Sequence, residues 1–246
     1  MTMLLDRYRE AVDDLFQKVR DTQTENIIKA GEIVAESVAN GGCIFLSRIC
    51  HSMEMDSIYR GGGPIFYKHF SYDLKIENAA RPRDRSDLQI ETDGAAERYA
   101  LTQSNVRPGD VLFLSSVSGR TKSVVDLAYE AVKLGIKVIA FTSMEYARQV
   151  EPVHPSGKKL YEIATLTLDN CAPAAEAMLD VEGIEARFAA ASGIASDYIM
   201  WSVTSVAVEK LLERGITPGI LKSANYPGGN DYNKTVVEPH YEEFGW

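Results

Sequence analysis

The stretch that decides the fold is RPGDVLFLSSVSGRT, which spans residues 107–121. Its first four residues have the composition of a tight turn, and the run DVLFLSS at 110–116 has the length of a buried strand. After the polar segment SVSGRT, apolar residues recur at helical spacing over 121–134, up to Gly135. Turn, strand, turn and amphipathic helix in this order predict part of a parallel βαβ unit.

Three more short apolar runs flank this unit: CIFLS at 43–47, KVIAFTS at 137–143 and ATLTLDN at 164–170. Continuous apolar runs are typical of parallel strands that are buried on both faces. A last long helix is predicted over about 195–213, where apolar residues again recur every three or four positions before Gly215. We therefore expect an α/β fold with an open, doubly wound sheet.

The composition is that of an ordinary globular protein, with 45% hydrophobic and 25% charged residues among 246. A formal net charge of −9 argues against nucleic acid as a partner, because phosphodiester backbones repel an acidic chain. It does not exclude a small phosphorylated ligand, since one local cluster of donors can hold a single phosphate.

Cysteine usage and hydropathy indicate a reducing, aqueous compartment. Cys43, Cys50 and Cys171 are widely spaced and form no CxxC pair, which argues against a disulfide framework or a structural zinc site. We find neither a signal peptide nor an apolar segment of membrane-spanning length in the sequence, so no membrane association is expected. The four histidines lack HxH or HExxH spacing, so no metal site is expected either. The predicted location is the cytoplasm.

The two ends of the chain depart from the α/β pattern. Residues 1–40 are predicted to form two helices, divided where Thr22 and Glu25 have the spacing of a capping box. Residues 78–93 are polar and predict a long surface loop, and residues 222–233 have turn residues with little apolar content. Because no repeat or linker divides the chain, we expect one domain over 1–246. It would consist of a helical segment 1–40, an α/β core 41–215 and a C-terminal tail 216–246.

The turn SVSGRT is the strongest candidate for a binding site. At the carboxyl end of a parallel strand, a ligand meets the positive end of the next helix and its unpaired N–H groups. Ser116, Ser118 and Thr121 add hydroxyl donors, and Gly119 permits close backbone approach or a positive φ. The prediction is a cradle for one phosphate monoester; the alternative is a serine-rich turn in which Thr121 only caps the helix. The segment matches neither a Walker A loop nor a dinucleotide GxGxxG motif.

Residues 107–143 resemble the phosphosugar-binding core of the sugar isomerase (SIS) domain family. The segments HPSGKKLYEIATLTLDN, VAVEKLLERGITPGI and SANYPGGNDYN resemble an uncharacterised bacterial subfamily labelled as putative phosphoheptose isomerases. The resemblance covers about residues 24–236. It implies a flavodoxin-like three-layer α/β/α sandwich with a five-stranded parallel sheet, a sugar phosphate ligand and no cofactor. It also implies a homodimer or homotetramer with sites shared between subunits.

The chain departs from this family in the turn after the first strand. Members usually have a glycine-rich turn with a serine that contacts the phosphosugar, whereas this chain has LSRICHS at 46–52 without glycine. One register places Cys50 in the position of the serine and keeps His51 beside it. Another register selects His51 and Ser52 and needs a two-residue gap. Both registers stay open.

Aldose–ketose isomerisation needs a base near C1 and C2 and a group that helps to open the sugar ring. The resemblance suggests Glu182 as the base, since a glutamate precedes the last small-residue turn, here AAASG with Ser192. Glu54 and Asp56 are weaker candidates on the helix that follows the first turn. His51 lies at a strand end beside the predicted ligand, and His154 lies in a loop where it would help to open the ring.

Asp169 and Asn170 end the last apolar run and are expected at the ligand-facing edge of the sheet, where they would bind sugar hydroxyls. The function expected from these residues is that of a sugar-phosphate isomerase acting through an enediol. A non-catalytic phosphosugar sensor is the alternative, because the same fold also serves in regulators. A phosphosugar lyase or etherase is a third hypothesis.

Overall fold

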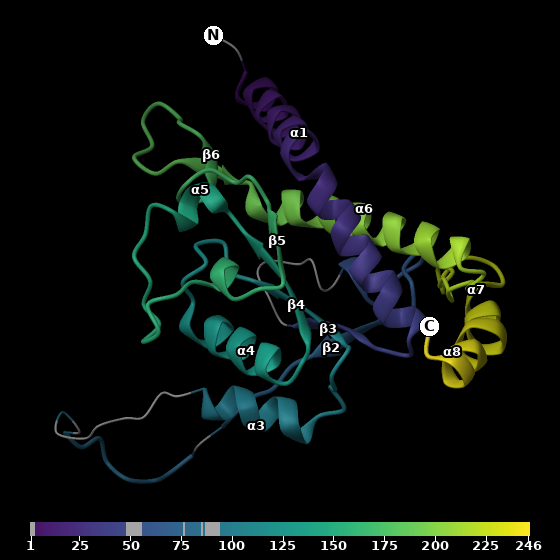
Figure 1. The fold of residues 1–246 in the computed structure, drawn as a ribbon. Helices are drawn as coiled ribbons and strands as arrows, with labels where there is room; N and C mark the ends of the chain where they lie inside the picture. The colour runs from purple at the N-terminus through teal and green to yellow at the C-terminus, as the bar shows by residue number, and fades with distance from the viewer. Residues whose placement is uncertain (1–2, 48–55, 76, 85, 87–93) are drawn as a thin grey trace.

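The computed structural model describes residues 3–47, 56–75, 77–84, 86 and 94–246. A five-stranded parallel sheet in the order β2-β1-β3-β4-β5 lies between two layers of helices (Figure 1). Its strands are β1 (Ile44–Ser47), β2 (Tyr67–Phe70), β3 (Val111–Ser115), β4 (Lys137–Thr142) and β5 (Leu166–Asp169). The predicted α/β sandwich with a parallel five-stranded sheet is confirmed.

Four of these strands lie within the four apolar runs that the sequence predicted, and β2 lies in none of them. Its sequence YKHF has only two apolar residues, and Lys68 and His69 are the less buried positions. β2 pairs with β1 alone at the edge of the sheet, and a strand exposed there does not need the continuous apolar run of a fully buried strand.

Two helices of the core, α4 and α6, agree with the sequence-based prediction. The helix predicted over 121–134 is α4, and the one predicted over 195–213 is α6, which begins three residues earlier. The helical elements are α1 (Leu4–Ala39), α3 (Ala95–Gln103), α4 (Lys122–Lys133), α5 (Met144–Ala147), the 3₁₀ turn η1 (Leu160–Glu162), α6 (Ser192–Glu213), α7 (Gly229–Tyr232), the π-helical turn η2 (Asn233–Val237) and α8 (Glu238–Phe244).

The prediction of two helices in the first forty residues is wrong, because α1 is one continuous helix of 36 residues. Thr22 does not begin a helix; its hydroxyl donates to the Lys18 carbonyl oxygen one turn back, at 2.7 Å. No proline or glycine interrupts residues 4–30, so nothing in the backbone stops the helix there. Gly31 then allows close contact with α6, since a Cβ at this position would lie 2.5 Å from Val206 Cβ.

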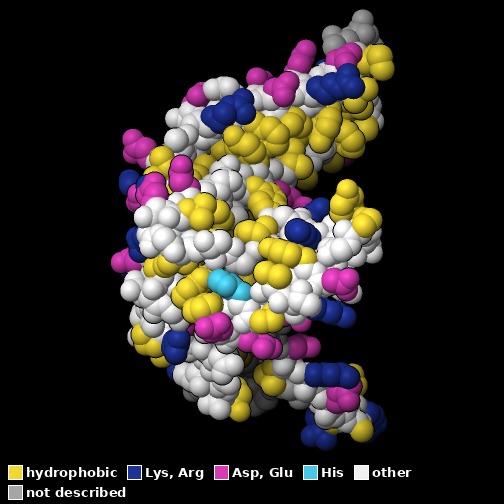
Figure 2. All heavy atoms as spheres, turned by 90° about the vertical axis from the view of Figure 1, so that its right-hand side faces the viewer, with side chains coloured by type: hydrophobic (Ala, Val, Ile, Leu, Met, Phe, Trp, Pro, Cys, Tyr) yellow, Lys and Arg dark blue, Asp and Glu magenta, His cyan; other side chains and the backbone are white. Residues whose placement is uncertain are grey.

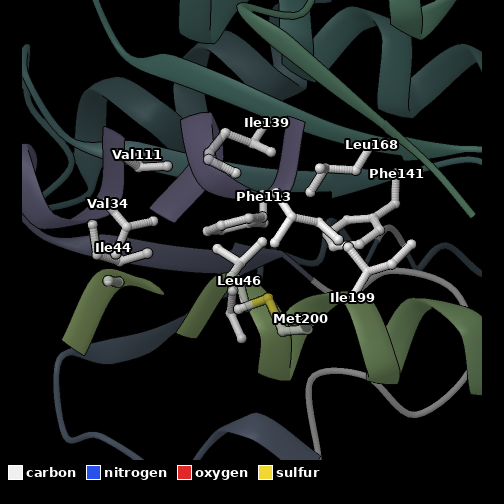
Figure 3. Packing of buried hydrophobic residues seen from close by; sticks show 14 of the residues in the cluster. Val34, Ile44, Leu46, Val111, Phe113, Ile139, Phe141, Leu168, Ile199 and Met200 are labelled. Carbon is white, nitrogen blue, oxygen red and sulfur yellow. The ribbon is translucent and has the colours of Figure 1, made fainter. Parts of the chain in front are cut away.

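The two faces of the sheet have separate hydrophobic clusters. On one face, Phe113, Ile139, Phe141 and Leu168 of the strands pack against α1 and against Ile199 and Met200 of α6 (Figure 3). On the other face, α3 and α4 pack against the alternate residues of the same strands, such as Leu112, Leu114, Val138 and Ala140. Because successive strand residues point to opposite faces, both sets come from the same apolar runs.

The segments that follow β2 and β5 differ in how far the sequence predicted them. The described residues of the predicted loop 78–93, which are 78–84 and 86, contain no helix or strand. After β5, strands β6 (Ala177–Leu179) and β7 (Phe188–Ala190) form an antiparallel hairpin that the sequence did not predict. In the part of the chain that the structure describes, no helix has the length and apolarity needed to cross a bilayer.

The C-terminal tail is more helical than its composition predicted, because α7, η2 and α8 follow one another over residues 229–244. The Asn233 side chain accepts a hydrogen bond from the Lys222 amide at 2.9 Å and donates to the Lys222 carbonyl at 2.8 Å. These two bonds hold the start of the tail against its own helical end.

Candidate functional site

The strand order places a crevice at the carboxyl ends of β1 and β3. The chain leaves β1 toward β2 on one side and leaves β3 toward β4 on the other, and ligands of open α/β sheets bind at such a switch point. A cavity of about 230 Å³ lies at this edge, on the face that α3 and α4 cover. Its lining includes Ser47 of β1, Ser71 after β2 and Ser123 in the first turn of α4.

The turn after β3 places its hydroxyl groups next to one another. The Ser116 and Thr121 hydroxyl oxygens are 2.9 Å apart, and the Thr121 amide donates to Ser116 Oγ at 3.3 Å. The Gly119 amide donates to the Ser116 carbonyl at 2.8 Å and closes the turn. Ser118 is half-buried, and its hydroxyl makes no hydrogen bond within the described residues, so it is available to a ligand.

Contacts from β4 and η1 fix this turn. The Thr142 hydroxyl donates to the Ser116 carbonyl oxygen at 2.7 Å and lies 3.1 Å from the carbonyl oxygen of Val117. The Leu160 amide donates to the Gly119 carbonyl at 2.8 Å. Gly119 has a φ of +68°, and a Cβ there would lie 3.4 Å from Ala147 Cβ and from Thr142 Oγ1. The positive φ therefore favours glycine, while a methyl group would make only ordinary contacts with these two neighbours.

The first turn of α4 keeps its amide donors available. Thr121 occupies the N-cap position, but its side chain does not bond to the helix. This result argues against the alternative in which Thr121 only caps the helix. Within the described residues, the amides of Ser123 and Val124 have no hydrogen-bond acceptor. Such donors and the positive end of the helix dipole form an anion-binding arrangement.

At the end of β5, Asp169 and Asn170 differ in their availability. Asp169 Oδ1 accepts hydrogen bonds from the amides of Met144 at 3.1 Å and Cys171 at 2.8 Å, which gives it a structural role in this turn. Asn170 is fully buried, and its Oδ1 accepts from the Ala172 amide at 3.2 Å. Its Nδ2 has no hydrogen-bond partner, and the residue has no surface exposed to solvent.

His154 is held by its own chain through both ring nitrogens. Nε2 lies 2.9 Å from Asp126 Oδ1, and Nδ1 lies 2.7 Å from the Ser156 hydroxyl. The ring also stacks on Tyr129, and the second oxygen of Asp126 pairs with Lys122. In this conformation the imidazole links the loop that follows residue 153 to α4 and has no nitrogen free for a substrate.

The matching family model is described as the SIS domain and covers residues 7–143. Two curated relatives from Streptomyces avermitilis and Streptomyces coelicolor, both named UPF0309 protein, are 34% and 33% identical over 239 and 238 residues. The alignments cover 96% of this chain in both cases and 95% and 94% of the relatives. The chain belongs to the SIS domain family. Within it, the chain is a member of the UPF0309 group, and the names of these relatives state no activity.

Solved structures show the same fold at low sequence identity. A phosphoheptose isomerase from Francisella tularensis superimposes with a TM-score of 0.52 at 14% identity, over 87% of this chain and 100% of that one. The enzyme of this type from Neisseria gonorrhoeae has a TM-score of 0.51 at 13% identity, over 84% and 96%. The Vibrio vulnificus NanR protein, solved with ManNAc-6P, has a TM-score of 0.50 at 15% identity, over 99% and 69%.

In this SIS domain, Glu182 and Ser192 have different surroundings. Glu182 is exposed in the connection between β6 and β7. Ser192 is buried at the start of α6, and its hydroxyl donates to Glu176 Oε1 at 2.9 Å. Glu176 has a φ of +70°, and its carbonyl accepts from the Ala191 amide. The sequence offered no signal for this glutamate, because the contact depends on the path of the hairpin.

The candidates in the first turn of the SIS domain, namely Cys50, His51, Ser52 and Glu54, lie outside the described residues. Asp56 is described and forms an ion pair with Arg60. Cys43 and Cys171 are free thiols, and burial raises the pKa of both. A raised pKa disfavours the thiolate, so neither has the setting of a nucleophile. Among the described residues, no three His, Cys, Asp or Glu side chains form a metal-binding group.

Proposed function

We propose that this SIS domain binds a sugar phosphate and isomerises it between aldose and ketose forms through an enediol. The observation that carries the proposal is the turn 116–121, where hydroxyl groups converge beside the uncapped first turn of α4. Neutral hydroxyl and amide donors at a helix N-terminus suit a phosphate monoester. Such a local site is compatible with a net charge of −9 for the whole chain.

The phosphate would be bound by Ser116, Ser118 and Thr121, with Gly119 allowing the backbone to approach it. The hydroxyls of Ser118 and Thr121 and the amides of Ser123 and Val124 supply donors from one side. Hydrogen bonds to a charged group contribute about 1.5–3 kcal/mol each, so a few of them give substantial affinity.

The sugar would extend from the phosphate along the carboxyl edge of the sheet. Asn170 lies at this edge, and its amide hydrogens have no partner in the chain; they would reach hydroxyl oxygens of a sugar once the residues that bury Asn170 move apart. Asp169 stays a candidate through the carboxylate oxygen that does not bond to the backbone amides. The first turn, with Cys50, His51 and Ser52, would lie beside the ligand.

The chemistry itself needs no cofactor. A base removes the proton on C2, the enediol forms, and a proton returns to C1. Glu182 was the base suggested by the resemblance, and its exposed position supports that role only where a second copy covers the hairpin and excludes water. His154 would act in ring opening only after it releases Asp126 or Ser156.

Self-association is part of the same proposal. The N-terminal end of α1 projects beyond the sheet (Figure 1). Met3, Leu4, Leu5 and Tyr8 are exposed there, and Phe188 of β7 is exposed beside them. Figure 2 shows hydrophobic side chains gathered in the upper part of the molecule, near this end of α1. A homodimer or homotetramer with shared sites would cover this exposed apolar surface.

A non-catalytic phosphosugar sensor is the second candidate function. It is favoured by the sequence LSRICHS, since an arginine and an isoleucine stand where the family usually has glycine. A bulky residue there hinders close approach of the backbone to a ligand. The cradle at 116–121 would serve a sensor and an enzyme equally well.

Proton NMR in heavy water, with a panel of pentose, hexose and heptose phosphates, distinguishes the two functions. Loss of the C2 proton signal or appearance of a ketose supports the isomerase. Line broadening of one sugar phosphate without exchange supports the sensor. No effect with any member of the panel contradicts both.

A further inference from the structure

A lysine is buried beside the turn 116–121. Lys159 follows the exposed Lys158 and stands directly before η1, and only 7% of its surface is accessible to solvent. Lysine is among the residues that are almost never fully buried unless they are paired. The position and the partners of this side chain therefore need an explanation.

Contacts with Gly119 place Lys159 at the turn. The next residue, Leu160, donates its amide to the Gly119 carbonyl at 2.8 Å, and a Cβ at Gly119 would lie 3.6 Å from Lys159 Cβ. The Lys159 Nζ donates to the Ala147 carbonyl oxygen at 2.5 Å, and the same Cβ at Gly119 would lie 3.4 Å from Ala147 Cβ. The covalent geometry of Ala147 then puts the ammonium within about 9 Å of the Cβ position at Gly119.

The Lys159 ammonium has no counter-charge among the described residues. Its hydrogen-bond acceptor is the Ala147 carbonyl, and no described carboxylate lies within ion-pair distance of Nζ. Glu162, the acidic residue closest to it in sequence, is exposed, and its Oε2 accepts from the Lys159 backbone amide at 2.8 Å. An ammonium can donate three hydrogen bonds, and a buried charge is costly unless it is paired. The chain thus keeps a positive charge next to the turn that an anion from outside would balance.

The turn itself offers a phosphate mainly neutral donors. Ser116, Ser118 and Thr121 have hydroxyl groups, and the first turn of α4 adds backbone amides. A phosphate monoester has a charge of about −1.5 to −2 at pH 7. Arg120 also belongs to the turn, but its side chain is more exposed than that of Lys159. Water screens the field of an exposed charge more strongly than that of a buried one, so Lys159 is the better source of a positive potential at the turn.

We propose that the Lys159 ammonium supplies the positive charge that attracts the phosphate group to the turn 116–121. The proposal rests on the function proposed above. It gives Lys159 a positioning role, since the ammonium acts from the Gly119 side of the turn without touching the phosphate. Its bond to Ala147 holds it at a fixed distance, so the charge needs no rearrangement when the ligand arrives. The site therefore favours a doubly charged phosphate over a singly charged anion of the same shape.

Lys159→Met tests this role in the full-length protein, with Lys158→Met as the matched control. Both changes remove one positive charge and keep a long side chain, but only Lys159 is buried. The first probe is methyl phosphate, which is a dianion at about pH 8. The second probe is methyl sulfate, a monoanion of the same shape. Proton NMR of the methyl groups gives the Kd of both probes.

The two variants should differ in a way that depends on the charge of the probe. For Lys159→Met we expect the Kd of methyl phosphate to rise about 10-fold and that of methyl sulfate about threefold, because a through-space energy is proportional to the ligand charge. For Lys158→Met both Kd values should stay within about twofold of the wild type, because solvent and salt screen an exposed charge.

Three results would overturn the assignment. An unchanged Kd of methyl phosphate in Lys159→Met shows that the lysine is too distant or uncharged. A loss by the same factor for both probes shows that Lys159 supports the shape of the turn and does not act on the charge of the ligand. An equal loss in Lys158→Met shows that only the overall charge of the chain matters.

A stability control separates loss of the charge from loss of structure. Methionine has nearly the length of lysine and removes a buried charge, so the Tm without ligand should change by only a few degrees. Lys159→Gln, which keeps a donor in the side chain, is the second variant and should show the same difference between the probes. A fall of the Tm by more than about 10 °C in both variants would overturn the assignment by giving Lys159 a structural role.

Failure of the proposed function gives a different result. Wild-type protein that binds neither methyl phosphate nor any sugar phosphate of the panel contradicts the cradle itself. Wild-type protein that binds methyl phosphate with a Kd that Lys159→Met leaves unchanged contradicts only the role of Lys159.

Discussion

The Ser116 and Thr121 hydroxyl oxygens lie 2.9 Å apart, five residues from each other, at the start of α4. Through this contact Thr121 bonds to the preceding strand end instead of to its own helix. The helix therefore begins without a side-chain cap, and its first amides are open to an anion. This relationship is the structural basis of the proposed phosphate site.

Replacing Ser118 and Thr121 together by alanine should abolish phosphosugar binding. Two hydrogen bonds to a charged group contribute about 3 kcal/mol or more, so isothermal titration should show affinity at least 100-fold weaker. The Tm without ligand should change by only a few degrees, because Ser118 makes no hydrogen bond in the described part of the protein. Thr102→Ala with Ser205→Ala is the matched control, since both hydroxyls are exposed and donate only within their own helices. Unaltered affinity in the first double variant would refute the cradle.

Gly119→Ala should lower both stability and affinity. The backbone φ of +68° disfavours a side chain by about 1–3 kcal/mol, and the new methyl group would also contact Ala147 and Thr142. Gly215→Ala has a similar φ of +75° but open space around its Cβ, and it isolates the backbone effect. Urea unfolding should show destabilisation in both variants, with affinity lost only in Gly119→Ala. Equal affinities in the two variants would contradict a role of the turn in binding.

His154→Ala should destabilise the protein by about 1–2 kcal/mol, because the imidazole links Ser156 to a carboxylate in a largely buried position. Ser156→Ala removes the exposed half of this link and should cost less. The Kd of the sugar phosphate should stay within a few-fold of the wild type in both variants. If His154→Ala left the stability unchanged and slowed the reaction of a ring-closed sugar, the result would contradict this structural role and support the role in ring opening that the sequence predicted.

Cys171 should react slowly with thiol reagents at neutral pH. Burial raises its pKa above the ordinary value of about 8.5, so the reactive thiolate is scarcer at pH 7 than in an exposed cysteine. In a Cys43→Ser/Cys50→Ser background, the rate of reaction with a disulfide reagent should still rise steeply with pH above about 8.5, where the thiolate of an ordinary cysteine is already half formed or more. The urea-unfolded protein is the control and should show ordinary thiol kinetics. Rapid labelling of the folded protein at pH 7 would contradict the buried setting.

Much of the candidate site could be predicted because its residues are contiguous. Ser116 to Thr121 lie in one turn between a strand and a helix, and local sequence specifies both elements through apolar periodicity. The edge strand β2, the hairpin β6–β7 and the single helix α1 were not predicted, since their form depends on packing against other elements. Nothing in the residues around Thr22 distinguishes a helix interior from a helix start.

The contacts made by distant residues explain the other differences. Glu176 takes the Ser192 hydroxyl across 16 positions, and His154 reaches Asp126 across 28, so neither pair has a spacing that a motif could reveal. The hydrogen-bond partners of neighbouring side chains also depend on the tertiary structure. Asp169 and Asn170 are neighbours in sequence, yet Asp169 bonds to backbone amides while the Asn170 amide is left without a partner.

The sequence by itself determined the α/β class, four of the five parallel strands, the helices α4 and α6, and the turn that would hold a phosphate. These features arise from hydrophobic periodicity and from the conformational preferences of glycine and hydroxyl residues, which act over a few positions. Only the tertiary structure decided that His154 is bound to its own chain, that Glu182 is exposed, and that Lys159 is buried beside the turn. Those properties depend on which side chains exclude water from which others, and that is settled when distant segments pack together.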